Sequence, residues 1–293
     1  MDKVLVVGGT GMLGRPVAVR LLSDGFAVRI FTGHPDRARR FFGDLVEYAA
    51  GDAGNRESLI RAMDGCDYVY VNLKGGPTKG DFLRVERDGS KNIYSAAKES
   101  GIKKVVQISE ARADERHIHF IQHRAKVEAE KALAASGLTY IVLKPTWFCE
   151  SIPLFIRGGK ATLIGSGKVS FHFLAAADYA KMVSECFQSS KADNKSLVVF
   201  GPERVSLTDA MQIFLSIVHP GIKISRLPMW LARLSAAFSM NAKLRAVVNL
   251  MAFFDKNDDT TVAGDPSEAD AIFGRSTTTV EEYARMYRQI VKG

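Results

Sequence analysis

Residues 3–14 read KVLVVGGTGMLG and decide the fold of this 293-residue chain. A Val-rich apolar run leads directly into three glycines spaced G-x-x-G-x-x-G, and residues 15–22 then have the composition of a helix. Strand, glycine turn and helix in this order form the context in which such glycines bind a dinucleotide. Gly8 would turn the chain off the strand, Gly11 would let backbone N–H groups approach a pyrophosphate, and Gly14 would let the helix pack closely. The alternative is a turn with a purely structural role.

Apolar runs and helical segments alternate from residue 3 to residue 144. We expect helices at 36–42, 56–63, 82–100 and 120–135, and strands at 3–7, 26–31, 45–50, 67–73, 104–109 and 139–144. This alternation predicts βαβ units and an α/β fold with a doubly wound, mostly parallel sheet. Right-handed crossovers would place the carboxyl ends of the strands at one edge, where ligands bind.

The alternation loosens after Pro145. We predict a helix at 178–189, a strand at 196–200 and a helix at 206–218 that Ser206 caps. The chain would therefore comprise a nucleotide-binding domain, residues 1–145, and a small α/β substrate lobe, residues 146–293, with segments that return to the main sheet. Residues 256–259 (KNDD) are expected to form an exposed turn.

Composition and charge narrow the class of protein. The net charge of +8 is spread along the chain, which favours solubility and anionic ligands, and no aromatic-and-basic patch indicates nucleic-acid binding. Cys66, Cys149 and Cys186 are scattered, so we expect reduced thiols in a cytoplasmic protein and no metal site. The first strand begins at once, which leaves no room for a signal peptide, and charges interrupt the apolar region 230–254, so no membrane span is expected.

Several short motifs accompany the glycine turn. They are Gly51-Asp52, Gly89 with Asn92, Lys126-Val127-Glu128, Ser136-Gly137-Leu138, Leu143-Lys144-Pro145, Asp178-Tyr179-Ala180 and Gly201-Pro202-Glu203. With them the chain resembles, almost from end to end, the NmrA-like atypical branch of the short-chain dehydrogenase/reductase superfamily. The resemblance implies an NAD(P)-binding Rossmann domain and a small substrate lobe. That family includes reductases, and also members without known turnover that act as redox sensors or assembly subunits.

The end of the second strand bears on the choice of cofactor. An NAD site usually has a carboxylate there for the ribose 2′-hydroxyl, whereas this chain has Thr32, Gly33 and His34, followed by Arg37. Cations would attract a 2′-phosphate, so NADP(H) is favoured over NAD(H), although the family often has an arginine in place of Gly33 and the arginines could simply form a solvated helix face. The predicted cofactor-binding residues are Gly8, Thr10, Gly11, Met12, Leu13, Gly14, Thr32, Gly33, His34, Arg37, Asp52, Ala53, Asn72, Leu73, Ser109, Lys126, Pro145 and Thr146.

The catalytic pair of the superfamily is incomplete. Its reductases usually carry Tyr-x-x-x-Lys on a helix; here Lys126 matches the lysine, but Gln122 stands in the tyrosine position and cannot act as an acid. His119 and His123 are nearby titratable groups. The predicted catalytic residues are Lys126, for the nicotinamide ribose, and Ser109, for a substrate carbonyl, with Glu110 an unusual neighbour. Pro145, Thr146, Trp147 and Phe148 are expected to line the nicotinamide and substrate pocket, with Cys149 as a pocket thiol.

Two functions therefore stay open. The first is an NADP(H)-dependent oxidoreductase that acts on a small carbonyl or conjugated substrate. The second is a cofactor-binding sensor or assembly protein without chemistry, which the missing tyrosine favours and which would need a protein partner. The same absence disfavours a sugar-nucleotide epimerase. We expect a monomer or a homodimer.

Overall fold

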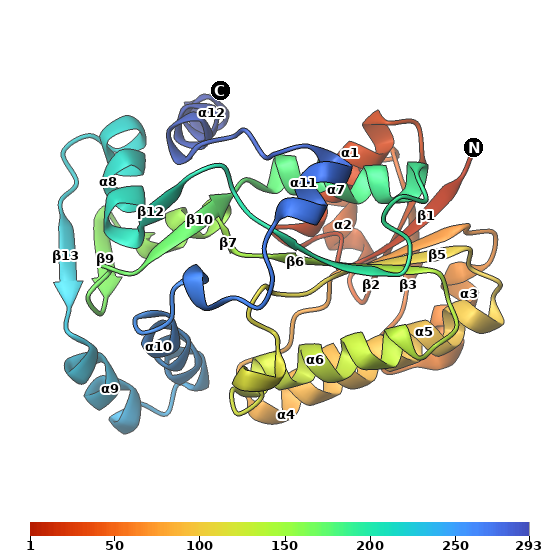
Figure 1. Ribbon diagram of the computed structural model, residues 1–293, viewed down its shortest axis with the longest axis horizontal. Coiled ribbons are helices and arrows are strands. Elements are labelled where there is room, and N and C mark those ends of the chain that lie inside the picture. Colours follow the sequence, from red (N-terminus) through yellow and green to blue (C-terminus); the bar gives the residue numbers. More distant parts are fainter. Residues whose placement is uncertain (293) are drawn as a thin grey trace.

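The structure is a computed structural model that describes residues 1–292, and it is built around one parallel sheet (Figure 1). Seven strands form this sheet in the order β11-β6-β5-β4-β1-β2-β3. Their bounds are β1 Lys3–Val7, β2 Ala27–Thr32, β3 Glu47–Ala50, β4 Tyr68–Val71, β5 Lys104–Ile108, β6 Tyr140–Pro145 and β11 Lys195–Val199. The expected α/β fold with a doubly wound parallel sheet is confirmed.

Helices cover both faces of the sheet (Figure 1). One face is packed by α1 (Gly14–Ser23), α2 (Pro35–Phe42), α7 (Ala176–Gln188) and α11 (Ser267–Phe273). The other is packed by α3 (Arg56–Met63), α5 (Ser90–Glu99) and α6 (Ile121–Ala134). Because both faces are covered, the central strand β1 is apolar over four successive residues, and Val4, Leu5, Val6 and Val7 are all buried.

The long helix expected at 82–100 has an irregular first half. A short α4 (Lys79–Asp81) leads into the π-helix η1 (Phe82–Gly89), which continues as α5. Gly89 lies where this element crosses the loops after β3 and β4. A Cβ there would lie only 3.2 Å from both Ala53 Cβ and Leu73 Cδ1, so glycine allows the close approach.

The second half of the chain forms a separate core beside the carboxyl ends of β5 and β6. It contains two three-stranded sheets, β12-β10-β7 and β13-β9-β8. Their strands are β7 (Trp147–Phe148), β8 (Ile156–Arg157), β9 (Lys160–Ile164), β10 (Ser170–Leu174), β12 (Arg204–Ser206) and β13 (Ile224–Leu227). The accompanying helices are η2 (Glu115–His117), η3 (Cys149–Phe155), α8 (Leu207–Val218), α9 (Met229–Phe238), α10 (Ala242–Phe254), η4 (Asp259–Thr261) and α12 (Val280–Lys292).

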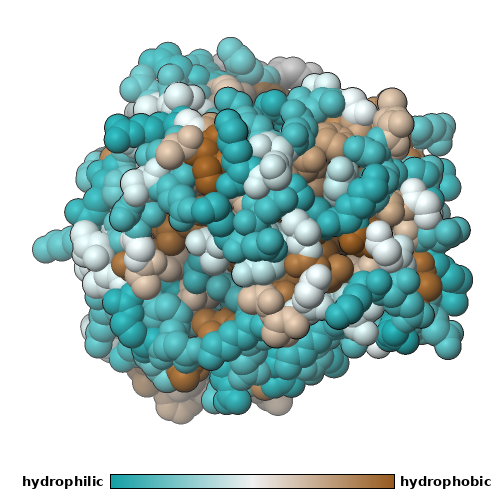
Figure 2. Space-filling view, turned by 45° about the vertical axis from the view of Figure 1, so that its right-hand side comes forward, coloured by the Kyte–Doolittle hydropathy of each residue, from teal (hydrophilic) through white to brown (hydrophobic). Residues whose placement is uncertain are grey.

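The strand that we expected at 196–200 is β11, and it pairs in parallel with β6. The Ser206 hydroxyl caps α8 by accepting the Asp209 N–H at 3.0 Å, as predicted. The division into units at residue 145 stays a prediction. Hydrophilic side chains dominate the face in Figure 2, with apolar residues scattered among them. Across residues 1–292, every helix is too short or too polar to cross a bilayer.

Candidate functional site

The glycine turn between β1 and α1 is fixed by close backbone contacts. Gly8 has φ +81°, and a Cβ there would lie 2.0 Å from the Asn72 carbonyl oxygen. A Cβ on Gly14 would lie 2.2 Å from the Gly8 carbonyl oxygen. Gly11 is exposed, and its Cβ would meet only Gly8 O at 3.3 Å. Packing therefore requires glycine at positions 8 and 14, whereas a side chain at 11 needs a shift of only a few tenths of an ångström from Gly8 O.

The start of α1 is suited to an anion. Leu13 is the N-cap residue and provides no side-chain cap, and the first turn carries no acidic residue. The first N–H groups of a helix have no partner within it, and they carry the positive end of the helix dipole. A pyrophosphate would meet these donors over Gly11, Met12 and Leu13, so the turn fits a dinucleotide.

The predicted adenosine-side residues lie on neighbouring loops after β2, β3 and β4. Gly33, His34 and Arg37 are all exposed at the start of α2, and the His34 N–H donates to Thr32 Oγ1 at 3.1 Å. Asp52 Oδ1 accepts the Gly54 N–H at 2.6 Å and shapes the loop after β3. The side-chain amide of Asn92 holds that loop by donating to Ala53 O at 3.0 Å.

The two predicted catalytic residues lie in a buried network of charges. Lys126 Nζ is 3.0 Å from Glu86 Oε2 on η1, and its side chain is 18% exposed. Burial alone would lower the pKa of Lys126, but Glu86 and Glu110 outweigh this effect and raise it. The Ser109 hydroxyl donates to Glu130, which also pairs with Lys144 at 3.2 Å.

Glu110 and His123 form a second pair. His123 Nε2 lies 3.1 Å from Glu110 Oε1, and the ring is fully buried. Burial raises the pKa of Glu110, but His123 and Lys126 lower it by more, so Glu110 carries its negative charge at neutral pH. His119, the other histidine considered, is exposed. The unusual neighbour of Ser109, Glu110, is thus held by His123. His123 lies about one helical turn before Lys126 on α6.

A small cavity opens where the loops after β5 and β6 meet the second core. The volume open to the centre of a water molecule is about 10 Å³, so the cavity has room for about one water. Its walls combine the expected pocket residues with residues from distant segments: Glu110, Ala111, Arg112, Pro145, Thr146, Trp147, Phe171, Phe254, Asp259 and Val262.

Two residues of the expected pocket wall point elsewhere. Phe148 is buried, with its ring edge-on to Tyr179 at a centroid distance of 5.4 Å. Cys149 is fully buried, and burial strongly raises the pKa of its thiol, which makes it a poor nucleophile. The Thr146 hydroxyl donates to His172 O at 2.6 Å and anchors the loop.

Three residues of this region carry no signal in the sequence that marks them as part of a site: Glu86, Arg112 and Asp259. The expectation of an exposed turn at 256–259 is wrong for Asp259, which is 4% exposed. Its carboxylate holds His172 Nδ1 at 2.8 Å and Arg204 Nε at 3.1 Å. No local pattern marks it, because both partners are far away in sequence.

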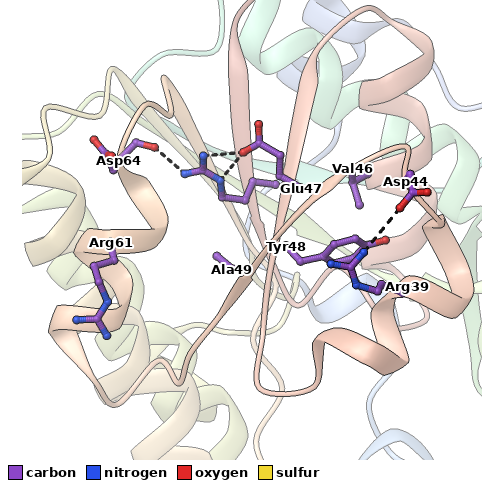
Figure 3. Close-up of a pocket in the computed structure, with 9 residues that line it drawn as sticks. Arg39, Asp44, Val46, Glu47, Tyr48, Ala49, Arg61 and Asp64 are labelled. Carbon is purple, nitrogen blue, oxygen red and sulfur yellow. Dashed lines mark hydrogen bonds and ion pairs between the residues drawn. The ribbon is translucent and has the colours of Figure 1, made fainter.

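A larger groove lies elsewhere, on edge strand β3 (Figure 3). It has a volume of about 470 Å³, and Arg29, Arg39, Glu47 and Tyr48 are among its lining residues. Arg29 binds Glu47 and the Asp64 carbonyl oxygen, and Arg39 pairs with Asp44 at 3.7 Å. These groups satisfy one another, and the groove contains none of the predicted site residues.

A family of NAD(P)H-binding proteins matches residues 8–189, which begin at the glycine turn and include α7. This chain belongs to the NAD(P)H-binding family. The match includes the glycine turn with Gly8, Gly11 and Gly14, and it establishes a nicotinamide dinucleotide as the ligand class.

Known relatives include catalytic and assembly proteins. The photosystem II assembly factor Ycf39 of Cyanophora paradoxa is 24% identical over 97% of this chain and 91% of its own length. A (4-alkanoyl-5-oxo-2,5-dihydrofuran-3-yl)methyl phosphate reductase of Streptomyces griseus is 28% identical over 69% of each chain. Among solved structures, the triphenylmethane reductase of Citrobacter sp. in complex with NADP(H) has a TM-score of 0.75 at 15% identity, covering 98% of this chain and 99% of its own, which shows a shared fold.

Proposed function

We propose that this protein is an NADP(H)-dependent oxidoreductase of the NmrA-like branch that reduces a small carbonyl or conjugated substrate. The observation that carries the proposal is the set of side chains that meets at the carboxyl ends of β5 and β6, around a cavity with room for about one water. Pro145 and Thr146, expected beside a nicotinamide, form part of its wall together with the rings of Trp147, Phe171 and Phe254. An apolar, aromatic wall with a few polar groups is typical of a site for a small organic substrate.

The residues that would hold the cofactor follow from the geometry of the strand ends. Gly11, Met12 and Leu13 would bind the pyrophosphate, Arg37 a 2′-phosphate, and Lys126 the nicotinamide ribose. A bound nicotinamide would supply the hydride. The raised pKa keeps Lys126 charged at neutral pH, so its role is to orient and to stabilise developing negative charge rather than to release a proton.

A second candidate is a cofactor-binding assembly or sensor protein. Gln122 in place of the tyrosine, the commitment of Lys126 to Glu86, and the likeness to Ycf39 over almost the whole chain support it. Such a protein would bind NADPH and change its affinity for a protein partner.

A measurement of turnover distinguishes the reductase from the assembly or sensor protein. We expect NADPH oxidation with at least one aldehyde, ketone or quinone of a broad panel, and a loss of about 10²- to 10³-fold in kcat for Lys126→Ala, because the variant lacks the cation that stabilises developing negative charge. Lys131→Ala, an exposed lysine on the same helix, is the control. Tight NADPH binding with a flat panel would support the assembly or sensor function instead.

A further inference from the structure

Arg112 is a buried cation, and two of its nitrogens find no hydrogen-bond partner within residues 1–292. It lies on the loop after β5, is 3% exposed, and lines the cavity described above. Its Nε and Nη2 atoms are buried and find no acceptor among the described residues. Burying a charge without such partners is costly, so a position of this kind calls for a functional reason.

The surroundings of Arg112 hold the guanidinium in place. Its Cζ atom lies over the rings of Phe171 and Phe254, 5.3 and 5.2 Å from their centroids. The loop itself is anchored, because the Ala111 N–H donates to Pro145 O and the Ala113 N–H to Glu110 O, both at 2.9 Å. Stacking on aromatic faces suits arginine and fixes the direction of its N–H groups.

The acidic side chains of the cavity are engaged elsewhere. Glu110 binds His123, and Asp259 binds His172 and Arg204. These carboxylates balance the charge of Arg112 from a distance but accept none of its hydrogen bonds. The cavity therefore presents two donors with no acceptor.

We propose that Arg112 binds a carboxylate of the substrate, in the cavity between Phe171, Phe254 and Pro145. Nε and Nη2 lie along the same edge of the planar guanidinium and can donate to both oxygens of a planar carboxylate. The free space beside Arg112 is that of about one water, so the cavity walls must move apart to admit the head group, and the reducible part of the substrate stays outside, beside Thr146. Naming the ligand as substrate rests on the reductase function proposed above; the anion site itself does not.

A matched pair of probes tests the site: 4-formylbenzoate and its uncharged methyl ester. Calorimetry on the full chain in the presence of NADP⁺ measures binding without turnover. We expect the acid to bind at least about 10-fold more tightly than the ester, and Arg112→Gln to weaken acid binding by about 10- to 100-fold while ester binding stays unchanged. Arg116→Gln, an exposed arginine of the same loop, should leave both affinities unchanged.

The Arg112 variants should fold. Because it removes a buried charge that two unpaired nitrogens share, Arg112→Gln should keep or raise the melting temperature. Arg112→Lys provides a second variant: it keeps the charge but loses the planar fork, and the preference for acid over ester should fall by about 10-fold.

The outcomes separate this inference from the reductase proposal. Equal affinity of acid and ester for the wild type, including no binding of either, overturns the carboxylate site, as does an Arg112→Gln variant that keeps the preference. Arg112-dependent acid binding with no NADPH oxidation leaves the site standing and removes the reductase. Reduction of acid and ester with the same kcat/KM, together with equal affinities for the two, supports the reductase and overturns the carboxylate site.

Discussion

At the scale of single residues, the three glycines of the first turn should behave differently. Gly11→Ala adds a methyl group 3.3 Å from Gly8 O, whereas Gly14→Ala places it at 2.2 Å. We expect Gly14→Ala to lower the melting temperature markedly. Gly11→Ala should keep the melting temperature and weaken NADPH binding by at least about tenfold, because the methyl group occupies the pyrophosphate surface. Unchanged NADPH affinity in Gly11→Ala would show that the turn has only a structural role.

Glu150 should make stability depend on pH. Its carboxylate accepts the Ala176 N–H at the start of α7, and burial raises its pKa to about 7 from 4.5. Between these values the folded protein binds more protons than the unfolded chain, so stability should fall as pH rises from 4.5 to 7. The Glu150→Gln variant has no carboxyl to ionise here, so its stability should not fall over this pH range. At pH 8 the free energy of unfolding of the variant should exceed that of the wild type by up to roughly 3 kcal/mol.

Urea unfolding at pH 4.5 and pH 8 measures the effect of Glu150. The two proteins should be nearly equal at the lower pH, where the folded-state carboxyl is protonated in the wild type. A constant difference at both values would mean that the pKa of Glu150 is the same in the folded and the unfolded state.

Residue identity predicted part of the site. The glycine turn, Lys126 and the Pro145–Thr146 loop were visible because each belongs to a short motif with fixed spacing. Arg112 and Asp259 were not, because their importance comes from contacts with segments about 60 to 140 residues away, such as Phe171, His172 and Phe254. A single sequence contains no record of those contacts.

At the scale of elements, η1 shows what periodicity cannot predict. The apolar pattern of residues 82–100 predicts a helix but not its π register, which brings Glu86 into the interior. There Glu86 accepts the Gly75 N–H at 2.8 Å and pairs with Lys126. The irregular turn thereby links the loop after β4 to α6, and π-helical turns are frequent at functional sites.

Replacing Glu86 tests that link. Glu86→Gln keeps an oxygen for the Gly75 N–H but leaves Lys126 without its nearest carboxylate. We expect the free energy of unfolding to fall by about 1–3 kcal/mol and the pKa of Lys126 to decrease. Glu128→Gln, which breaks the more exposed pair with Arg124, should cost less than about 1 kcal/mol. Similar losses in the two variants, measured by urea unfolding, would contradict a special role for the η1 contact.

At the scale of the whole molecule, the net charge of +8 should influence the choice of cofactor. We expect NADPH to bind more tightly than NADH at low salt, with the difference shrinking as salt rises, because exposed cations such as Arg37 are screened. Arg37→Ala should reduce the difference, and Arg61→Ala, on the distant β3 groove, should not. Equal affinities for both cofactors at low salt would refute the preference.

Adding a positive charge at position 33 tests the same preference in the opposite direction. Gly33 is exposed, and a Cβ there would meet only Gly51 O at 3.7 Å, so a side chain fits. Gly33→Arg should increase the preference for NADPH by several-fold to about tenfold, through one charged hydrogen bond at an exposed site. An unchanged ratio of the two affinities would place the 2′-phosphate elsewhere.

The seventh strand has a consequence for how this protein could evolve or be engineered. β11 covers the edge of β6, and it comes after the segment that the family match spans. A fragment that ended before Lys195 would expose the backbone of β6 as an open edge, which promotes self-association. Recombination between relatives at a point inside residues 146–194 would thus exchange β11, one strand of the parallel sheet, along with the rest of the second half, so the two halves are not expected to behave as exchangeable modules.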